Sequence, residues 1–316
     1  MTGTFTLGWS GAAATDRNRS PLETISALAA SALLVVSTAG TVLEQSALSN
    51  EPARAEGKAA DKGAMTLPTN ETMLGAYTGV PYTYPSPVTI GTEGSGTDFH
   101  IDPVHWYTAP FHNPIYYGVR VARWFAGGKV GGMVDFIHSK AMAELGQEAS
   151  FKGTIDDQPL PERARVRDVV KKMEFSHGHN MLLLTGLLRL PSIGAHLSPY
   201  VGAGGGALLP HTELALRKGQ HPRTYEYNFA GPAGQALAGI EIRLSRMSIF
   251  IEYKFTYGDY EAPLSEKEGS WLGADLWRQI SRWLNDEPPP GGHVTTEIVS
   301  HQVVGGLAVR FAPAAQ

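Results

Sequence analysis

Histidine and carboxylate side chains gather in one short segment, where a single glycine separates His177 from His179. Glu174 precedes this pair, and His211 with Glu213 forms a second group further along the chain. Alternate residues of a β-strand point to the same side, so a strand through this segment would aim both imidazoles at one face. Two imidazoles and one carboxylate suit divalent transition metals and form the ligand set of non-haem iron.

These spacings predict a divalent transition-metal site held by His177, His179 and His211, with Glu174 in its place as the alternative third ligand. We nominate His177, His179 and Glu174 as the catalytic residues of such a site. Histidine pairs separated by one residue also occur on strands without metal, so ordinary polar side chains at a wet barrel mouth are an equal interpretation.

The composition excludes several other kinds of site. The 316 residues include no cysteine, which excludes disulfides and thiolate-bound metals. A formal net charge of -4 gives no indication of a nucleic-acid partner. The glycine-rich run 202–206 lies within a predicted strand, so it is not a phosphate-binding loop.

The histidines lie within or beside segments in which apolar and polar residues alternate. Alternation with a period of two predicts strands that are apolar on one face and polar on the other. The clearest case, Ser248–Tyr257, sets isoleucines and aromatic residues against Glu252 and Lys254. Eight segments carry such a pattern or a weaker form of it: Glu71–Tyr84, Ile115–Trp124, Val130–Lys140, Met181–Leu190, Pro199–Leu209, Gln235–Leu244, Ser248–Tyr257 and Gln302–Phe311.

The connections between these segments alternate between short and long. Short turns at 126–129, 191–196 and 245–246 alternate with long connections at about 85–114, 143–175, 215–225 and 261–295. Short periplasmic turns and long external loops are typical of bacterial outer-membrane barrels. The prediction is an all-β fold, an eight-stranded antiparallel transmembrane β-barrel of the OmpA-like kind, located in the bacterial outer membrane.

The charged residues distinguish this barrel from a soluble one. A lipocalin-like barrel also alternates, but it places apolar residues inside and polar residues outside. Arg120, Glu241, Glu252, Lys254 and Arg310 all lie opposite the aliphatic face, so we predict that they point into the lumen. Eight strands leave a lumen that side chains just fill, which favours a packed charge network over a channel.

The fourth long loop contains a helical pattern. Leu272, Leu276, Ile280 and Leu284 recur at helical spacing, and tryptophans accompany them. We predict a short amphipathic helix that lies in the outer-leaflet interface, or alternatively packs over the barrel mouth as a lid. The predicted contacts with substrate or membrane are Trp271, Trp277 and Trp283.

The two ends of the chain are consistent with export. Basic residues before an apolar run at 25–36 predict a signal segment within residues 1–55, cleaved after Ala39 or Ala55. An uncleaved anchor helix is the alternative. Residues 56–70 then form a linker and 71–316 the barrel. Phe311 resembles the terminal aromatic residue that the outer-membrane assembly machinery recognises, although five residues follow it.

Several stretches together resemble the rhizobial lipid A oxidase family of outer-membrane proteins. They are residues 114–120 (PIYYGVR), 133–140 (MVDFIHSK), 174–181 (EFSHGHNM), 209–213 (LPHTE) and 231–239 (GPAGQALAG). The resemblance runs from about Leu74 to Phe311. It implies that O2 oxidises the proximal glucosamine of lipid A to 2-aminogluconate, so lipid A, or lipopolysaccharide, is the expected partner. It assigns no residue roles.

Two other functions fit the same residues. His177 and Asn180 resemble part of the His-x-Ser-Asn motif of outer-membrane deacylases, which suggests a lipid A acyl-ester hydrolase. However, His179 occupies the serine position, and alternation places Ser176 on the opposite face. A non-catalytic OmpA-type barrel with a structural or adhesive role is the other alternative.

Overall fold

A computed structural model describes residues 70–218, 224–264 and 271–311. The predicted signal segment, almost all of the linker, and the residues after Phe311 lie outside these ranges. Neither helix in the described part of the chain is long and apolar enough to cross a bilayer.

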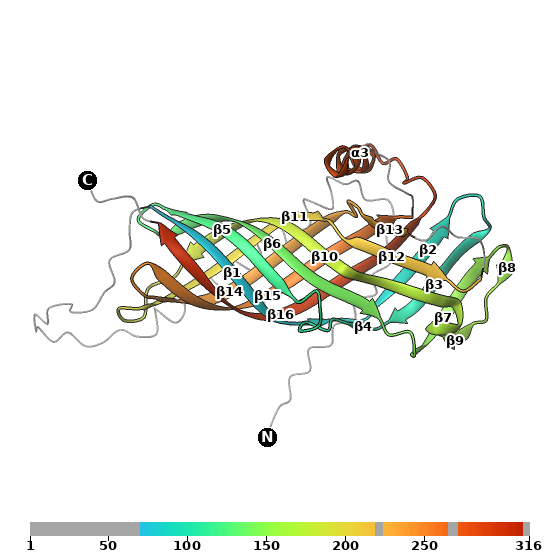
Figure 1. Ribbon diagram of the computed structural model, residues 1–316, viewed down its shortest axis with the longest axis horizontal. Helices are drawn as coiled ribbons and strands as arrows, with labels where there is room; N and C mark the ends of the chain where they lie inside the picture. The colour runs from blue at the N-terminus through green and yellow to red at the C-terminus, as the bar shows by residue number, and fades with distance from the viewer. Residues whose placement is uncertain (1–69, 219–223, 265–270, 312–316) are drawn as a thin grey trace, which may run out of the picture.

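Eight antiparallel strands close into a barrel, with β1 paired to both β5 and β16. Around the barrel these strands are β1 (Glu71–Thr83), β5 (Tyr117–Phe125), β6 (Val130–Ala143), β10 (Val170–Arg189), β11 (Leu197–Leu208), β14 (Pro232–Arg243), β15 (Met247–Pro263) and β16 (His293–Phe311). Every segment predicted as a strand is present, so the predicted fold class is confirmed. Figure 1 shows the strands crossing obliquely along the long axis of the molecule.

The outer surface of the barrel is apolar along the part nearest the short turns. Leu184 and Ile251 are 67% and 59% exposed, and similar side chains surround them on the neighbouring strands. Aromatic residues including Tyr82, Tyr117 and Tyr253 stand at the outer edge of this surface. We call it the lipid-facing belt, because an apolar band edged by aromatic residues is what a bilayer requires.

Charged side chains fill the lumen behind the belt, as the alternation predicts. Lys254 is 0% exposed, and its Nζ lies 2.5 Å from Asp135 Oδ2. Arg120 Nη1 lies 2.5 Å from Glu252 Oε1, and its guanidinium stacks over Phe250. Such pairing offsets the cost of removing charges from water, so the lumen is a packed interior rather than a channel.

A second charge cluster fills the turn end of the lumen around Glu71. Arg243 Nη2 donates to Glu71 Oε1 over 2.9 Å, and Arg310 Nη1 donates to the same oxygen over 3.2 Å. Arg189 Nη2 donates to Glu241 over 3.0 Å. The cluster ties the first barrel strand to the last and closes the ring with ionic contacts as well as backbone hydrogen bonds.

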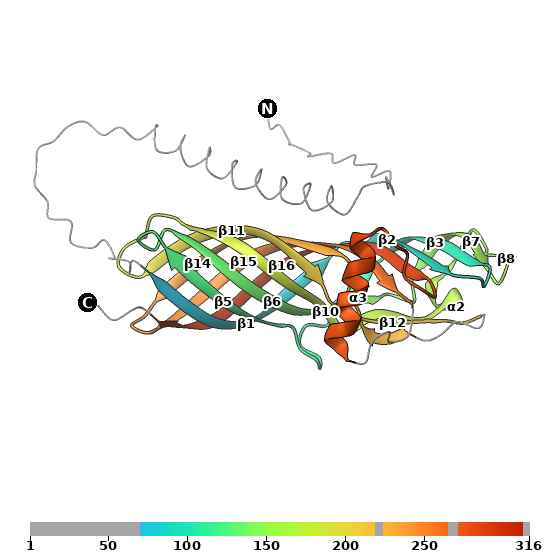
Figure 2. The ribbon, with the colours of Figure 1, turned by 90° about the horizontal axis from the view of Figure 1, so that it is seen from above.

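The long external connections between the barrel strands contain strands and helices of their own. They contain β2 (Ser86–Thr92), β3 (Thr97–Val104), β4 (Trp106–Tyr107), β7 (Glu148–Ile155), β8 (Gln158–Pro159), β9 (Arg163–Arg165), α2 (Val166–Val169), β12 (His211–Leu216), β13 (Thr224–Tyr227) and α3 (Leu272–Leu284). Figures 1 and 2 show these strands projecting beyond the barrel at the end opposite the short turns. We call this part the outer region.

The outer region has an apolar core, which is continuous with buried apolar residues of the barrel such as Phe250. Strands β16, β2, β3 and β7 form one wall, and β6, β10 and β12 form the other. Ile101 and Phe151 from the first wall, and Phe175 and Leu214 from the second, belong to one buried hydrophobic cluster. Buried apolar side chains thus fill the space between the two walls beyond the charged lumen.

Candidate functional site

The segment that carries both nominated histidines is a bulge in β10. Five residues of β10, from Phe175 to His179, lie opposite only three residues of β6, from Ala141 to Ser139. Gly178 within the bulge has a φ of +147°, a conformation that L side chains rarely adopt. The two extra residues interrupt the alternation locally, so Phe175 and His179 point inward and are each 2% exposed, while His177 between them is exposed on the outer face.

The alternation predicted that both rings share the lumen-facing side. This is right for His179 and wrong for His177, because the count of alternating residues assumes an unbroken strand. Ser176, predicted to lie opposite His177, is instead beside it, with Ser176 Oγ 3.3 Å from His177 Nδ1.

His179 is enclosed beneath the outer core. Its Nδ1 is hydrogen-bonded to the hydroxyl of Tyr260, and the ring of Tyr260 lies 4.6 Å from that of Phe175. Burial lowers the pKa of His179 to about 3, so its imidazole is neutral at physiological pH. His179 therefore joins β10 to β15 across the interior, away from solvent.

The outer face of β10 and β12 carries a cluster of charged side chains. Glu174 lies opposite Glu213 in the strand register, and Lys172 Nζ contacts both carboxylates at 2.6 and 2.7 Å. Ser176 Oγ donates to Glu174 Oε1 over 2.8 Å. At the neighbouring positions Met173 and Leu214 point into the apolar core, so the alternation directs Glu174 and Glu213 to the opposite face, where Glu213 is nevertheless buried and 1% exposed.

Two histidines and a tyrosine continue this cluster toward the membrane. The rings of His177 and His211 are 5.1 Å apart, and the ring of Tyr227 lies 4.8 Å from that of His211. Tyr227 also donates a hydrogen bond to the backbone carbonyl of His177 over 3.3 Å. We call the whole set the outer-rim cluster: Lys172, Glu174, Ser176, His177, His211, Glu213 and Tyr227.

The predicted metal ligands are divided between two environments. His177 and His211 are brought together, whereas His179 is inside the wall with Tyr260. In the described ranges no three histidine, aspartate or glutamate side chains stand in an arrangement that would hold a metal ion. The residues present do not fit a three-ligand centre, and no step of a reaction is routed through one below.

Asn180 of the deacylase-like motif is also separated from His177. Its Oδ1 lies 2.8 Å from His138 Nδ1, and its amide nitrogen donates to the carbonyl of Leu209 over 3.1 Å. Asn180 is therefore a tie between β6, β10 and the start of the β12 hairpin. It is not a partner of Ser176.

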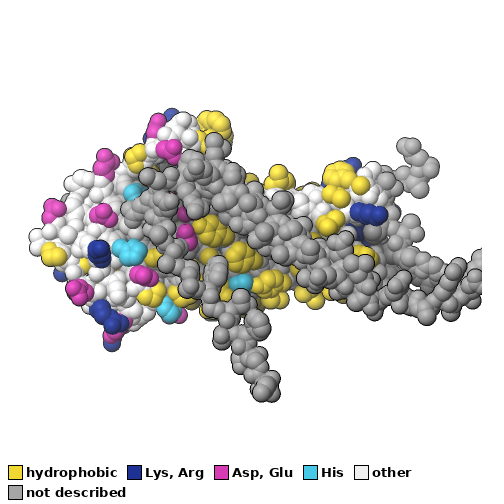
Figure 3. Space-filling model, turned by 180° about the vertical axis from the view of Figure 1, so that it is seen from behind, with side chains coloured by type: hydrophobic (Ala, Val, Ile, Leu, Met, Phe, Trp, Pro, Cys, Tyr) yellow, Lys and Arg dark blue, Asp and Glu magenta, His cyan; other side chains and the backbone are white. Residues whose placement is uncertain are grey.

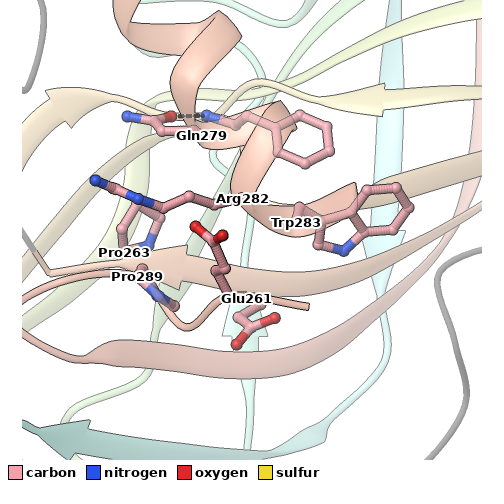
Figure 4. A pocket seen from close by; sticks show the side chains of 8 residues that line it. Glu261, Pro263, Gln279, Arg282, Trp283 and Pro289 are labelled. Carbon is pink, nitrogen blue, oxygen red and sulfur yellow. Dashed lines mark hydrogen bonds between the residues drawn. The ribbon is translucent and has the colours of Figure 1, made fainter. Parts of the chain in front are cut away.

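The predicted amphipathic helix is present as α3, outside the barrel wall. Trp271 and Trp277 are 65% and 68% exposed, whereas Trp283 packs edge-on against Phe229. A groove runs between the helix and the wall, and the side chains that line it include Glu261, Pro263, Gln279, Arg282 and Trp283 (Figure 4).

Sequence reasoning missed two members of the outer-rim cluster, Lys172 and Tyr227, and assigned a third, Ser176, to the face opposite His177. Lys172 and Ser176 are two residues before and two residues after Glu174, so alternation places all three side chains on one face of the strand. A prediction that extended the strand before residue 181 would have placed them together. Tyr227 follows a connection that was interpreted as a loop. Its contact with His211 arises from the pairing of β12 with β13, which the sequence did not indicate.

No family model and no curated protein matches the chain. Among solved structures, Neisserial surface protein A has 8% sequence identity and a TM-score of 0.32, with 77% of this chain and 97% of that chain covered. The outer membrane protease OmpT from Escherichia coli has 8% identity and a TM-score of 0.36, with the same coverage. A Pseudomonas aeruginosa FadL homologue has 8% identity and a TM-score of 0.21, covering 77% of this chain and 90% of that chain. At such scores the architecture rests on the strand pairing and exposed belt of this chain itself.

Proposed function

We propose that the protein is an outer-membrane enzyme that modifies lipid A, and that the outer-rim cluster is its active surface. One observation carries the proposal: ionisable side chains gather in the wall directly beyond the lipid-facing belt, with His177 exposed on the outer face and His211 and Glu213 buried beside it. On β10 the outermost strongly exposed leucine is Leu182, and the bulge with His177 begins a few residues beyond it. Head groups of the outer leaflet occupy this level.

Access to the cluster is from the side. The lumen is filled with paired charges, and buried apolar side chains fill the space beyond it. A substrate that already resides in the membrane reaches His177 and Glu174 without leaving the leaflet. Lipid A has its sugar at the head-group level and its acyl chains along the belt, which matches the polar cluster above and the apolar surface below.

The reaction we propose is oxidation of the proximal glucosamine to 2-aminogluconate, as the resemblance to lipid A oxidases implies. The aldehyde carbon, which exists as a ring hemiacetal, loses two electrons to O2 and gains one oxygen from water, so an acid and hydrogen peroxide form. His177 is exposed and suited to accept the proton of the anomeric hydroxyl, and Glu174 and Lys172 hold the polar surface around it. The divalent transition metal predicted from the sequence has no part in this step, because His179 is buried apart from His177 and His211.

Mass spectrometry of lipid A incubated with the refolded protein and O2 tests this function. We expect a product heavier by one oxygen, and loss of that product in His177→Ala. The control is His196→Ala, because His196 lies in the short turn after β10 at the other end of the barrel. Unchanged lipid A in the presence of folded wild-type protein and O2 would contradict the oxidase.

A second candidate, an acyl-ester hydrolase, is favoured by the contacts of Ser176. Its hydroxyl lies 2.8 Å from Glu174 Oε1 and 3.3 Å from His177 Nδ1, so a nucleophile, an acid and an imidazole adjoin. The same mass spectra distinguish the two reactions, since a hydrolase removes an acyl chain. Ser176→Ala would abolish deacylation and leave oxidation largely intact.

A further inference from the structure

Helix α3 presents its polar side to the protein. Asp275 is 1% exposed and Gln279 is 7% exposed, and they are the helix residues classed as buried. Gln279 Oε1 accepts a hydrogen bond from the backbone N–H of Phe229 over 2.6 Å, and its Nε2 donates to Asn228 Oδ1 over 3.2 Å. A helix that packs on a soluble core would bury its apolar side instead.

The place where α3 docks is a seam in the wall. In the part of the chain that the structure describes, β13 is paired as a strand with β12, and β15 beyond Gly258 with β16. One backbone hydrogen bond, from the Glu261 N–H to the carbonyl of Ala230 over 2.7 Å, links the two edges. Phe229 follows β13, while Glu261 and Pro263 belong to β15, and all three line the groove beneath the helix. Gln279, Arg282 and Trp283 of the helix complete that groove (Figure 4), so α3 bridges the two edges.

The apolar side of α3 lies about a quarter turn from the buried side. Successive residues advance by about 100° around a helix, which places Leu276, Ile280 and Leu284 to one side of the line through Asp275 and Gln279. Leu272, Trp277 and Leu284 are exposed on this apolar side. With this quarter-turn offset, the helix can contact the barrel wall with its buried side and a surface perpendicular to that wall with its apolar side.

The orientation of α3 supplies that perpendicular surface. Figure 2 shows the helix axis running across the long axis of the barrel, and therefore parallel to the plane of the membrane. Figure 3 shows hydrophobic side chains on the edge of the protruding helix that is nearer the transmembrane part, with charged side chains on the other edge. The apolar side of α3 thus continues the lipid-facing belt at its outer rim.

We propose that α3 lies in the outer-leaflet interface, with Leu272, Trp277, Ile280 and Leu284 in contact with lipid. The helix then fixes the depth of the barrel in the membrane and covers the seam at the level of the head groups. Tyr227 of the outer-rim cluster precedes the residues that α3 binds, Asn228 and Phe229, so the docked helix borders the proposed active surface. The docking itself does not depend on any catalytic activity.

Spin labelling tests the docking directly, since the chain has no cysteine and a single introduced thiol is the only label site. Leu284→Cys carries the label on the apolar side of α3, and Arg278→Cys carries it on the opposite, exposed side of the same helix. In phosphatidylcholine vesicles we expect the label at 284 to collide more often with oxygen, which concentrates in the bilayer, than with a water-soluble nickel chelate. We expect the label at 278 to collide more often with the nickel chelate than with oxygen.

Equal and high accessibility of both labels to the nickel chelate would overturn the proposal and favour a solvent-exposed lid. Protection of the 284 label from both reagents, together with a dimer in sedimentation, would overturn it in favour of a second copy of the chain. Brominated phosphatidylcholine gives an independent reading on the unlabelled protein. Its quenching of tryptophan emission should fall in Trp277→Phe and remain in Trp106→Phe, because Trp106 is buried in the outer core.

Discussion

The transmembrane barrel and the outer region are built from the same strands but differ in their interiors, because buried ion pairs lie among apolar residues such as Phe250 in the barrel, whereas the buried cluster of the outer region is apolar. In β15, Glu252 and Lys254 are buried inside the barrel while Ile251 and Tyr253 face outward. Further along the same strand the inner positions are Tyr260 and Ala262, which belong to the apolar core. Burial alternates without interruption along β15, and only the chemistry of the buried residues changes.

The change of interior follows the change of solvent. Around the belt the surroundings are hydrocarbon, so apolar side chains gain nothing by moving inward and charges must be paired inside. Beyond the belt the surroundings are water, so apolar burial is again the main source of stability. The outer-rim cluster lies where the two regimes meet, and the contrast between them can be tested region by region.

The largest expected effect is on the transmembrane interior. Lys254→Met leaves the carboxylate of Asp135 buried without its ion pair, and breaking such a pair costs about 3–5 kcal/mol. Urea unfolding of the protein in vesicles measures this loss. The double variant Asp135→Leu/Lys254→Met should recover most of the stability. Equal destabilisation by the single and double variants would show that the loss does not come from an unpaired carboxylate.

The next effect is confined to the outer region. Ile101 is 0% exposed in the apolar core, so Ile101→Ala should destabilise that core by roughly 2–5 kcal/mol. Limited proteolysis should then cut the outer strands while the membrane-embedded strands stay protected. Ile251→Ala, at a lipid-facing position, is the matched control, and loss of the whole barrel in Ile101→Ala would show that the two regions unfold as one.

A smaller effect is expected at the bulge where the regions join. Gly178 has a positive φ, and an added methyl group would also meet the side chain of Asn180. Gly178→Ala should therefore cost about 1–3 kcal/mol and turn His177 away from His211. The rate of lipid A modification should fall even under conditions in which the variant remains fully folded. Gly132→Ala is the control, since its added methyl would meet nothing within 4 Å.

The smallest effect is the response of the outer region to pH. Burial, followed by repulsion from Glu297 and Glu261, raises the pKa of Asp259 from 3.8 to about 6. Because the folded state holds the proton more tightly, this contribution is complete below about pH 3.8 and is lost as the pH rises through about 6. Thermal unfolding at pH 5 and pH 7.5 measures it, and Asp259→Asn should remove that part of the pH dependence.

The sequence alone determined the barrel. An alternation of two residues is set by strand geometry, so eight segments and the inward direction of Arg120, Glu252 and Lys254 followed from residue types without knowledge of any contact. The helix Leu272–Leu284 followed in the same way from its own period. These predictions depend only on residues near one another in the chain.

The tertiary structure decided what the long connections and the nominated histidines do. The outer core joins residues such as Ile101 and Leu214, and no local pattern shows which distant strand will cover another. Likewise, a two-residue bulge in β10 reversed the direction of His177, because alternation holds only while partner strands advance together. The positions of the outer-rim residues therefore depend on the register of β10, which is fixed only by its pairing with β6 and β12.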